Sequence, residues 1–202
     1  MHRRALVAVT LGTLLALAPA QGEARQLGKL GGALKKAQQL KDIGMPEAVE
    51  VLLGSQVSTK VRARYGVVQD AAVHKYVTLV GTALTQVSSR PSLKWQFIVL
   101  DTDAVNAFAA PGGFVHITKG ALANLKTESE LAGVLGHEII HVTEKHTIRA
   151  IQKGKLVQMG ADEKMSGALM NKLADKAYEV IDNGFGRGDE LEADEKGIVL
   201  AN

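Results

Sequence analysis

The fold is decided by residues 127–141, which read TESELAGVLGHEIIH. Thr127 and Glu130 form a capping box, a pair of side chains that accept hydrogen bonds from free backbone N–H groups at the start of a helix. Apolar residues then recur at helical spacing, at Leu131, Val134, Leu135 and Val142. The pattern predicts one helix from Thr127 to about Ile151, ending before Gly154.

His137 and His141 lie four residues apart on this helix, so they share a face with their Cβ atoms about 5–6 Å apart. Imidazole nitrogens at that spacing can both reach one zinc ion at about 2 Å. Glu138 lies about 100° around the helix from His137, where a general base can take a proton from an activated water. A pair of surface histidines explains the same spacing. His146 points off the shared face and is assigned to packing or to the surface.

A hydrolytic zinc site has three protein ligands and one position open to water. Residues 190–194 read ELEAD and are predicted to lie on the last helix of the chain. Glu190 and Asp194 share a face of that helix. Glu190 could complete the zinc site, and Asp194 could accept the free N–H of a ligating histidine. The segment also fits a solvated acidic helix, which is the interpretation given to Glu192 and Glu195.

The other segments predict a mixed domain. Helical spacing from Pro46 onward, and again after a capping Asp70, predicts two helices. Residues 93–100 and 114–118 have the composition of strands. Another helix is predicted by the spacing of Leu169, Leu173, Ala177 and Val180, and Asp189 is expected to cap the last one. The fold class is therefore α+β, mostly helical with a small sheet.

The N-terminus has the order of a cleavable secretory signal. Met1-His2-Arg3-Arg4 is basic, an apolar run extends from Ala5 to Ala18, and small residues follow at Ala18-Pro19-Ala20. The apolar run is short for a membrane span, although a retained anchor is the alternative. We expect a signal peptide over residues 1–24, a linker or loosely packed helix over residues 25–44, and a periplasmic or secreted protein.

Composition narrows the class of protein. Of the 202 residues, 46% are hydrophobic and 22% are charged, the balance of a globular domain. The chain holds no cysteine, which excludes disulfides, thiolate ligands and a cysteine nucleophile. Residues 1–24 carry two arginines and one glutamate, so the formal charge falls from +3 to about +2 without them. That charge does not argue for a nucleic-acid partner.

Three motifs in this order resemble one family. Residues 106–113 read NAFAAPGG, and they precede the helix of residues 127–141 and the motif of residues 190–194. Together they resemble the HtpX/CAAX-prenyl-protease-type zinc metallopeptidases, most closely the exported BepA/LoiP-like and mitochondrial Oma-type branch. The resemblance covers roughly residues 45–200. It implies a zincin-like fold of the gluzincin type, with residues 45–202 as the metallopeptidase catalytic domain.

The resemblance also implies a complete set of zinc ligands. One Zn²⁺ per chain is expected, held by His137, His141 and Glu190, with Glu138 as the catalytic base and Asp194 behind a ligating histidine.

In this family the strand that follows the Pro-Gly-Gly turn borders the cleft. Residues 114–118 are therefore expected to form an edge strand that pairs with the backbone of an extended substrate. A buried structural strand is the alternative. The candidates for contact with the substrate are Asn106, Phe114, Val115, His116 and Arg187.

The activity that the resemblance implies is hydrolysis of peptide bonds in protein substrates, such as misfolded or unassembled envelope proteins, with outer-membrane assembly proteins as partners. The alternative is a chaperone or assembly factor with a latent protease site, which binds clients along the edge strand. A purely structural zinc site is disfavoured, because such sites are closed by four protein ligands. Relatives usually continue beyond the third motif, so we expect the domain to be truncated at its C-terminus.

Overall fold

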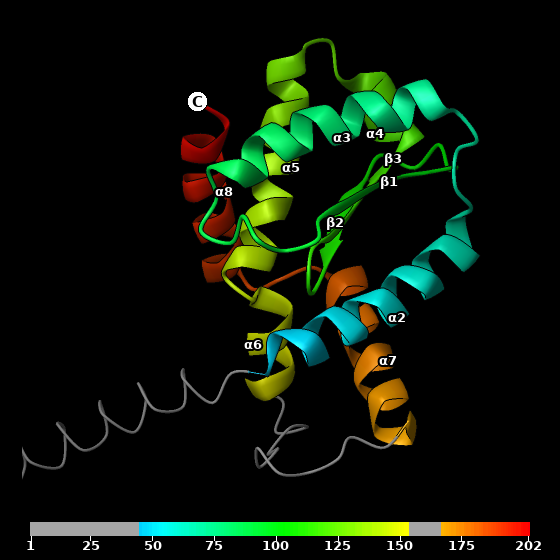
Figure 1. The fold of residues 1–202 in the computed structure, drawn as a ribbon, viewed down its shortest axis with the longest axis vertical. Helices are drawn as coiled ribbons and strands as arrows, with labels where there is room; N and C mark the ends of the chain where they lie inside the picture. Colours follow the sequence, from blue (N-terminus) through cyan, green and yellow to red (C-terminus); the bar gives the residue numbers. More distant parts are fainter. Residues whose placement is uncertain (1–44, 154–166) are drawn as a thin grey trace, which may run out of the picture. The chain divides into compact units, whose positions relative to one another are not determined.

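The computed structural model describes residues 45–153 and 167–202 (Figure 1). The signal peptide predicted for residues 1–24 and the linker predicted for residues 25–44 lie outside this part of the chain. Within it, two helices precede three strands, and five helices follow. The predicted class, mostly helical α+β with a small sheet, is confirmed. None of the described helices is both long and apolar enough to span a membrane.

The first two helices, α2 (Glu47–Tyr65) and α3 (Ala71–Gln86), confirm the predictions for this segment. Helix α3 begins where predicted, because the Asp70 side chain accepts hydrogen bonds from the backbone N–H groups of Ala72 and Val73 at 2.8 and 3.2 Å. Each helix buries an apolar stripe at helical spacing. The stripe is Leu53, Val57 and Val61 on α2, and Val77, Val80 and Leu84 on α3.

The sheet contains β1 (Gln96–Leu100), β2 (Ala107–Ala110) and β3 (Phe114–Thr118) in the order β1-β3-β2. Strand β3 runs parallel to β1 and antiparallel to β2. Gly112 and Gly113, with φ of 74° and 103°, form the turn between β2 and β3, a conformation that favours glycine. The sequence interpretation missed β2, whose four residues are too few to show a clear strand pattern.

The prediction that β3 lies at the edge of the sheet is wrong. All five of its residues are buried, and both of its edges are paired. The reason is that helices cover both faces of the sheet, so even the polar His116 and Thr118 of β3 are buried. Ile98, Leu100, Ala110 and Phe114 lie in the core cluster that includes residues of α2 and α7 (Gly167–Asn183). Phe97, Val99, Val115 and Ile117 lie in the cluster that includes α3 and α5 (Glu128–Thr143).

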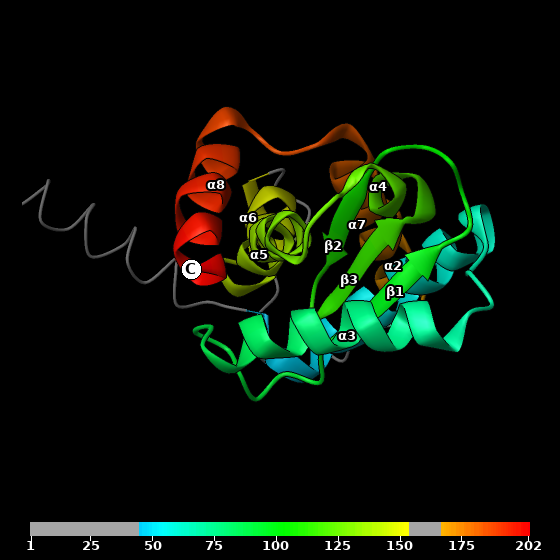
Figure 2. The same ribbon diagram turned by 90° about the horizontal axis from the view of Figure 1, so that it is seen from above.

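Helix α5 runs beside β2, after the short helix α4 (Lys119–Asn124), and places its inner face against the sheet (Figure 2). Its capping box is confirmed: Thr127 Oγ1 accepts from the Glu130 N–H at 3.2 Å, and Glu130 Oε2 accepts from the Thr127 N–H at 3.3 Å. The single helix predicted to Ile151 is wrong. The helix ends at Thr143, and Lys145 takes a positive φ of 56°, after which α6 (His146–Lys153) begins. Because α6 has its own buried stripe, apolar periodicity did not reveal the break.

Helix α8 (Arg187–Ala201) packs along the side of α5 that faces away from the sheet (Figure 2). It begins two residues before the predicted cap, with Gly186 as N-cap, and Asp189 instead accepts from Arg149 Nη2 at 2.8 Å. The two backbones touch: a Cβ on Gly197 would lie 2.9 Å from the backbone nitrogen of His137. This close approach brings the acidic side chains of α8 next to the histidines of α5.

Candidate functional site

The structure brings the three predicted metal ligands together from two helices. His137 and His141 project from α5 and Glu190 from the first turn of α8, with one ligand atom of each within 4.8 Å of the others. The two histidine Nε2 atoms lie 2.9 Å apart, and His137 Nε2 lies 3.4 Å from Glu190 Oε2. Three donor atoms therefore point at one small region.

Asp194 orients the first of these histidines. His137 Nδ1 donates its proton to Asp194 Oδ1 at 2.9 Å, since a carboxylate only accepts. In the neutral ring this leaves a lone pair on Nε2, the atom that faces His141 and Glu190. Asp194 is thus placed as the sequence interpretation expected.

The second histidine, His141, is fixed by burial and by contacts with two other rings. His141 is buried, its ring stacks on Phe185 with centroids 4.2 Å apart, and its Nδ1 lies 2.7 Å from Nδ1 of His146. Burial, with help from the positive charge that His137 and His146 can carry, lowers the pKa of His141 to about 3. The ring is therefore neutral at physiological pH and has a lone pair to offer.

These donors fit a zinc ion. Two imidazoles and one carboxylate are ligands that Zn²⁺ accepts, and three of them leave its fourth position open. Among the described residues, Glu190 forms no ion pair with a lysine or arginine; its Oε1 accepts only from the Phe185 N–H, at 3.1 Å. Within residues 45–153 and 167–202, the site thus gathers electron-pair donors without a balancing lysine or arginine.

Glu138 lies beside the ligands but is not one of them. Its side chain is buried, and no described residue donates a hydrogen bond to its carboxylate. Burial, and next the negative charge of Glu190, raise the pKa of Glu138 to about 8. With that pKa the carboxyl group holds a proton at neutral pH, and a cation bound beside it would lower the pKa and free the carboxylate to accept a proton.

A cleft of about 650 Å³ opens over the cluster. Helix α5 forms one wall, and Asn106, Ala107 and Phe108 at the start of β2 form another. The end of α7, the following loop through Phe185 and the first turns of α8 complete it. Of the residues predicted to contact a substrate, only Asn106 lines this cleft.

The other four predicted contacts lie elsewhere. Phe114, Val115 and His116 are buried in the central strand, and Arg187 is exposed at the start of α8 without lining the cleft. His116 packs against α2, where its Nε2 is 2.9 Å from Ser58 Oγ. Its burial lowers its pKa to about 4. The assignments of Phe114, Val115 and His116 assumed an edge position for β3, whereas β3 is paired on both edges.

The sequence interpretation missed three residues of the site. His146, assigned to packing or to the surface, is fully buried against His141, and Glu192, assigned to solvent, lies 3.2 Å from His146 Nε2. Hydrogen bonds from Lys196 and Arg149 lower the pKa of Glu192 to about 2. Phe185 stacks on His141 from the loop before α8. On a straight helix the His146 side chain would point away from His141. The positive φ at Lys145 turns the chain so that His146 faces His141. No pattern of residues in the sequence predicts such a turn.

The known proteins to which this chain is similar are proteases. The model of Peptidase family M48 matches residues 71–202. The chain is 28% identical to the beta-barrel assembly-enhancing protease of Yersinia pestis, over 96% of this chain and 43% of that protein. It is 27% identical to the Escherichia coli K12 protein of the same name, over 75% of this chain and 34% of that protein.

A mitochondrial relative is also similar. The mitochondrial metalloendopeptidase OMA1 of Schizosaccharomyces pombe is 33% identical, over 62% of this chain and 38% of that protein. The chain spans less than half the length of these relatives.

Proposed function

The chain belongs to peptidase family M48, and from this we propose that it is a zinc-dependent metalloendopeptidase that cuts peptide bonds in protein substrates. One observation carries the proposal: His137, His141 and Glu190 converge in a cleft, with the Glu138 carboxylate beside them. A site with three protein ligands keeps a position for water or substrate, whereas structural zinc sites are closed by four.

The side chains of the site have separate tasks in this reaction. When bound, zinc supplies a Lewis acid that polarises the scissile carbonyl and lowers the pKa of water to about 7. Glu138 accepts a proton from the attacking water on its carboxylate and passes it to the leaving amine. Asp194 keeps the proton of His137 on Nδ1, so the ring cannot turn its other nitrogen away from the site.

We propose β2 as the strand that binds the substrate. It lies at an edge of the sheet beside α5, and residues 106–108 line the cleft opposite His137 and Glu138. An extended peptide pairing with the free edge of β2 would run past the catalytic carboxylate. This replaces the assignment to β3, whose edges are both occupied.

The cellular substrates follow as part of the same proposal. Two relatives are named beta-barrel assembly-enhancing proteases, and the N-terminal sequence has the order of a secretory signal. We therefore infer a periplasmic or secreted enzyme that removes misfolded or unassembled envelope proteins, with residues 45–202 as its catalytic domain.

The test uses the purified chain, its zinc content and cleavage of casein. We expect about one zinc ion per chain, loss of cleavage with a chelator and recovery when zinc is returned. Glu138→Gln should keep its zinc and lose cleavage, whereas Glu195→Gln, an exposed carboxylate on α8, should cleave normally. Cleavage by Glu138→Gln at the normal rate would rule out the mechanism.

The same experiment addresses the chaperone alternative, since the free edge of β2 is also a surface for client strands. Zinc-loaded protein that binds unfolded clients but never cuts them, with binding unchanged in Glu138→Gln, would favour that role over proteolysis.

A further inference from the structure

His146 is the buried polar group nearest to the site that the mechanism above does not use. Its side chain is fully buried, and its Nδ1 lies 2.7 Å from Nδ1 of His141. Their rings are nearly perpendicular, with centroids 4.8 Å apart and an angle of 73°. Two ring nitrogens at this distance share one proton, so one histidine donates and the other accepts.

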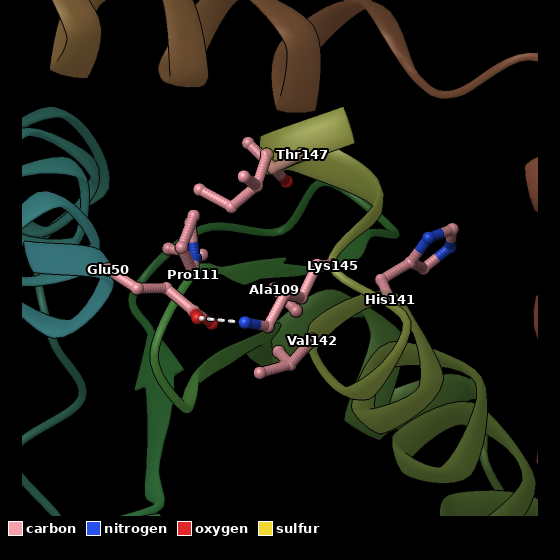
Figure 3. Close-up of a pocket in the computed structure, with 9 residues that line it drawn as sticks. Glu50, Ala109, Pro111, His141, Val142, Lys145 and Thr147 are labelled. Atoms are coloured by element: carbon pink, nitrogen blue, oxygen red, sulfur yellow. Dashed lines mark ion pairs between the residues drawn. The ribbon is translucent and has the colours of Figure 1, made fainter. Parts of the chain in front are cut away.

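The turn between α5 and α6, which precedes His146, is held in place by ion pairs and hydrogen bonds on the other side of α5. Lys145 Nζ lies 3.4 Å from Oε2 of the buried Glu50. Glu50 also accepts two hydrogen bonds from Arg90, which in turn donates to the Val142 carbonyl near the end of α5. Figure 3 shows Glu50 and Lys145 pointing at each other while the His141 ring points away on the opposite side of the helix. The turn is thus tied to α2, so the position of His146 is set by the fold.

The direction of the hydrogen bond follows from the groups behind His146. Its Nε2 lies 3.2 Å from Oε2 of Glu192. Arg149 Nη2 and Lys196 Nζ donate to the same carboxylate at 3.0 and 2.8 Å. A carboxylate held by two cations only accepts, so His146 must donate from Nε2. A neutral His146 then has its lone pair on Nδ1, facing His141.

We propose that His146 is a positioning residue that accepts the Nδ1 proton of His141 and so fixes the tautomer that presents the Nε2 lone pair to the metal. The inference rests on the proposed zinc site. It gives the two ligands equivalent support: Asp194 holds His137 directly, and Glu192 holds His141 through His146. Both supports come from α8, the helix that also carries Glu190.

A second metal site at the same place is the competing interpretation, because His146, Asp189 and Glu192 also have donor atoms within 4.8 Å of one another. However, the Arg149 guanidinium lies 2.8 Å from Asp189 and 3.0 Å from Glu192. It already supplies the positive charge between the two carboxylates, so this cluster is a support for His141.

Two variants of His146 separate acceptance of the proton from mere packing. In His146→Asn the amide oxygen can take the place of Nδ1 as acceptor, whereas His146→Leu fills the space without one. We expect His146→Leu to weaken zinc binding about 10–100-fold, the usual effect of losing the partner behind a ligand, and His146→Asn to stay close to the natural protein. Zinc affinity is measured on the full chain by competition with a chelator, and thermal unfolding shows whether each variant is folded.

A second readout needs neither metal nor activity. Imidazole nitrogen NMR of the metal-free natural chain should show His146 protonated on Nε2 and not on Nδ1, so that Nδ1 accepts from His141, and the His146→Leu spectrum should show the Nε2 tautomer of His141 becoming more populated. Protonation of His146 on Nδ1 in the folded natural chain would overturn the proposal, even if neither variant folds. Equal zinc affinity for His146→Leu and the natural protein would also overturn it. If the chain bound no zinc at all, the proposed function would fail, while the NMR result would still test the tautomer.

Discussion

Two clusters of charged and polar side chains lie on opposite sides of the turn between α5 and α6, and they differ in how their charges are balanced. Around Glu50, whose side chain is 1% exposed, Arg90, Lys145 and the Gly112 N–H satisfy the carboxylate. Around His137, His141 and Glu190, electron-pair donors converge without a lysine or arginine among the described residues to balance them. The first cluster is closed by the chain itself, whereas the second is arranged to receive a cation.

This difference predicts that the metal cluster can be changed without loss of folding, while the Glu50 cluster cannot. Burying a charge is tolerated when the fold supplies its partner, and removal of that partner is costly. Ligand residues of a catalytic site are instead held by packing and by hydrogen bonds behind them, so their loss is expressed in binding and turnover.

The largest effect is expected from Glu190→Ala. Because this variant removes one of the three proposed ligands, zinc affinity should fall by more than the roughly 10–100-fold expected for a partner behind a ligand, and cleavage should disappear. The free energy of unfolding of the metal-free protein should stay nearly unchanged. Chelator competition and urea unfolding measure the two quantities, and a metal-free Glu190→Ala protein that is strongly destabilised would contradict the contrast.

Glu50→Ala should instead act mainly on the free energy of unfolding. Without this carboxylate the partly buried Arg90 loses its main partner, and we expect a loss of about 3–5 kcal/mol in the free energy of unfolding. Glu47→Ala is the matched control, since this exposed carboxylate also pairs with Arg90 and should be worth at most about 1 kcal/mol. Similar losses in the two variants would show that the buried cluster is not a structural hub.

Buried His116 should make the stability of the metal-free protein depend on pH. Burial lowers its pKa from 6.5 to about 4, so as the pH falls below 6.5 the unfolded chain takes up a proton that the folded chain refuses. The contribution of His116 to the free energy of unfolding is therefore fully present above pH 6.5, and about 3 kcal/mol of it is lost as the pH approaches 4. Urea unfolding of metal-free protein should show a shallower dependence on pH in His116→Gln; an unchanged dependence would contradict this origin.

The smallest effect is expected from Gly197→Val, which tests the approach of α8 to α5. The added side chain meets the backbone of His137, so the helices must separate, at a cost of about 1–3 kcal/mol and with weaker zinc binding as Glu190 moves away. Gly188→Val on the same helix is the control, because a Cβ there meets no other atom within 4 Å. Unchanged zinc affinity in Gly197→Val would show that Glu190 tolerates a shift of α8.

Several elements were predictable because their signals are local. The Thr127–Glu130 capping box, the Asp70 cap and the apolar stripes of α2 and α3 each involve residues within a few turns of one another, and the structure confirms them. The helical spacing of His137 and His141 is local in the same way. Strand β2 and the break after Thr143 were missed, since a short strand and a single positive φ leave no periodic signal.

The sequence by itself determined the helix of the two histidines, the mostly helical class and the candidate carboxylates, because periodicity and capping act between neighbours along the chain. Only the tertiary structure decided that β3 is central, that α8 touches α5 closely enough for Glu190 and Asp194 to reach His137, and that His146 folds back onto His141. Such contacts join residues far apart in the chain, and they depend on how whole elements pack to bury their apolar faces.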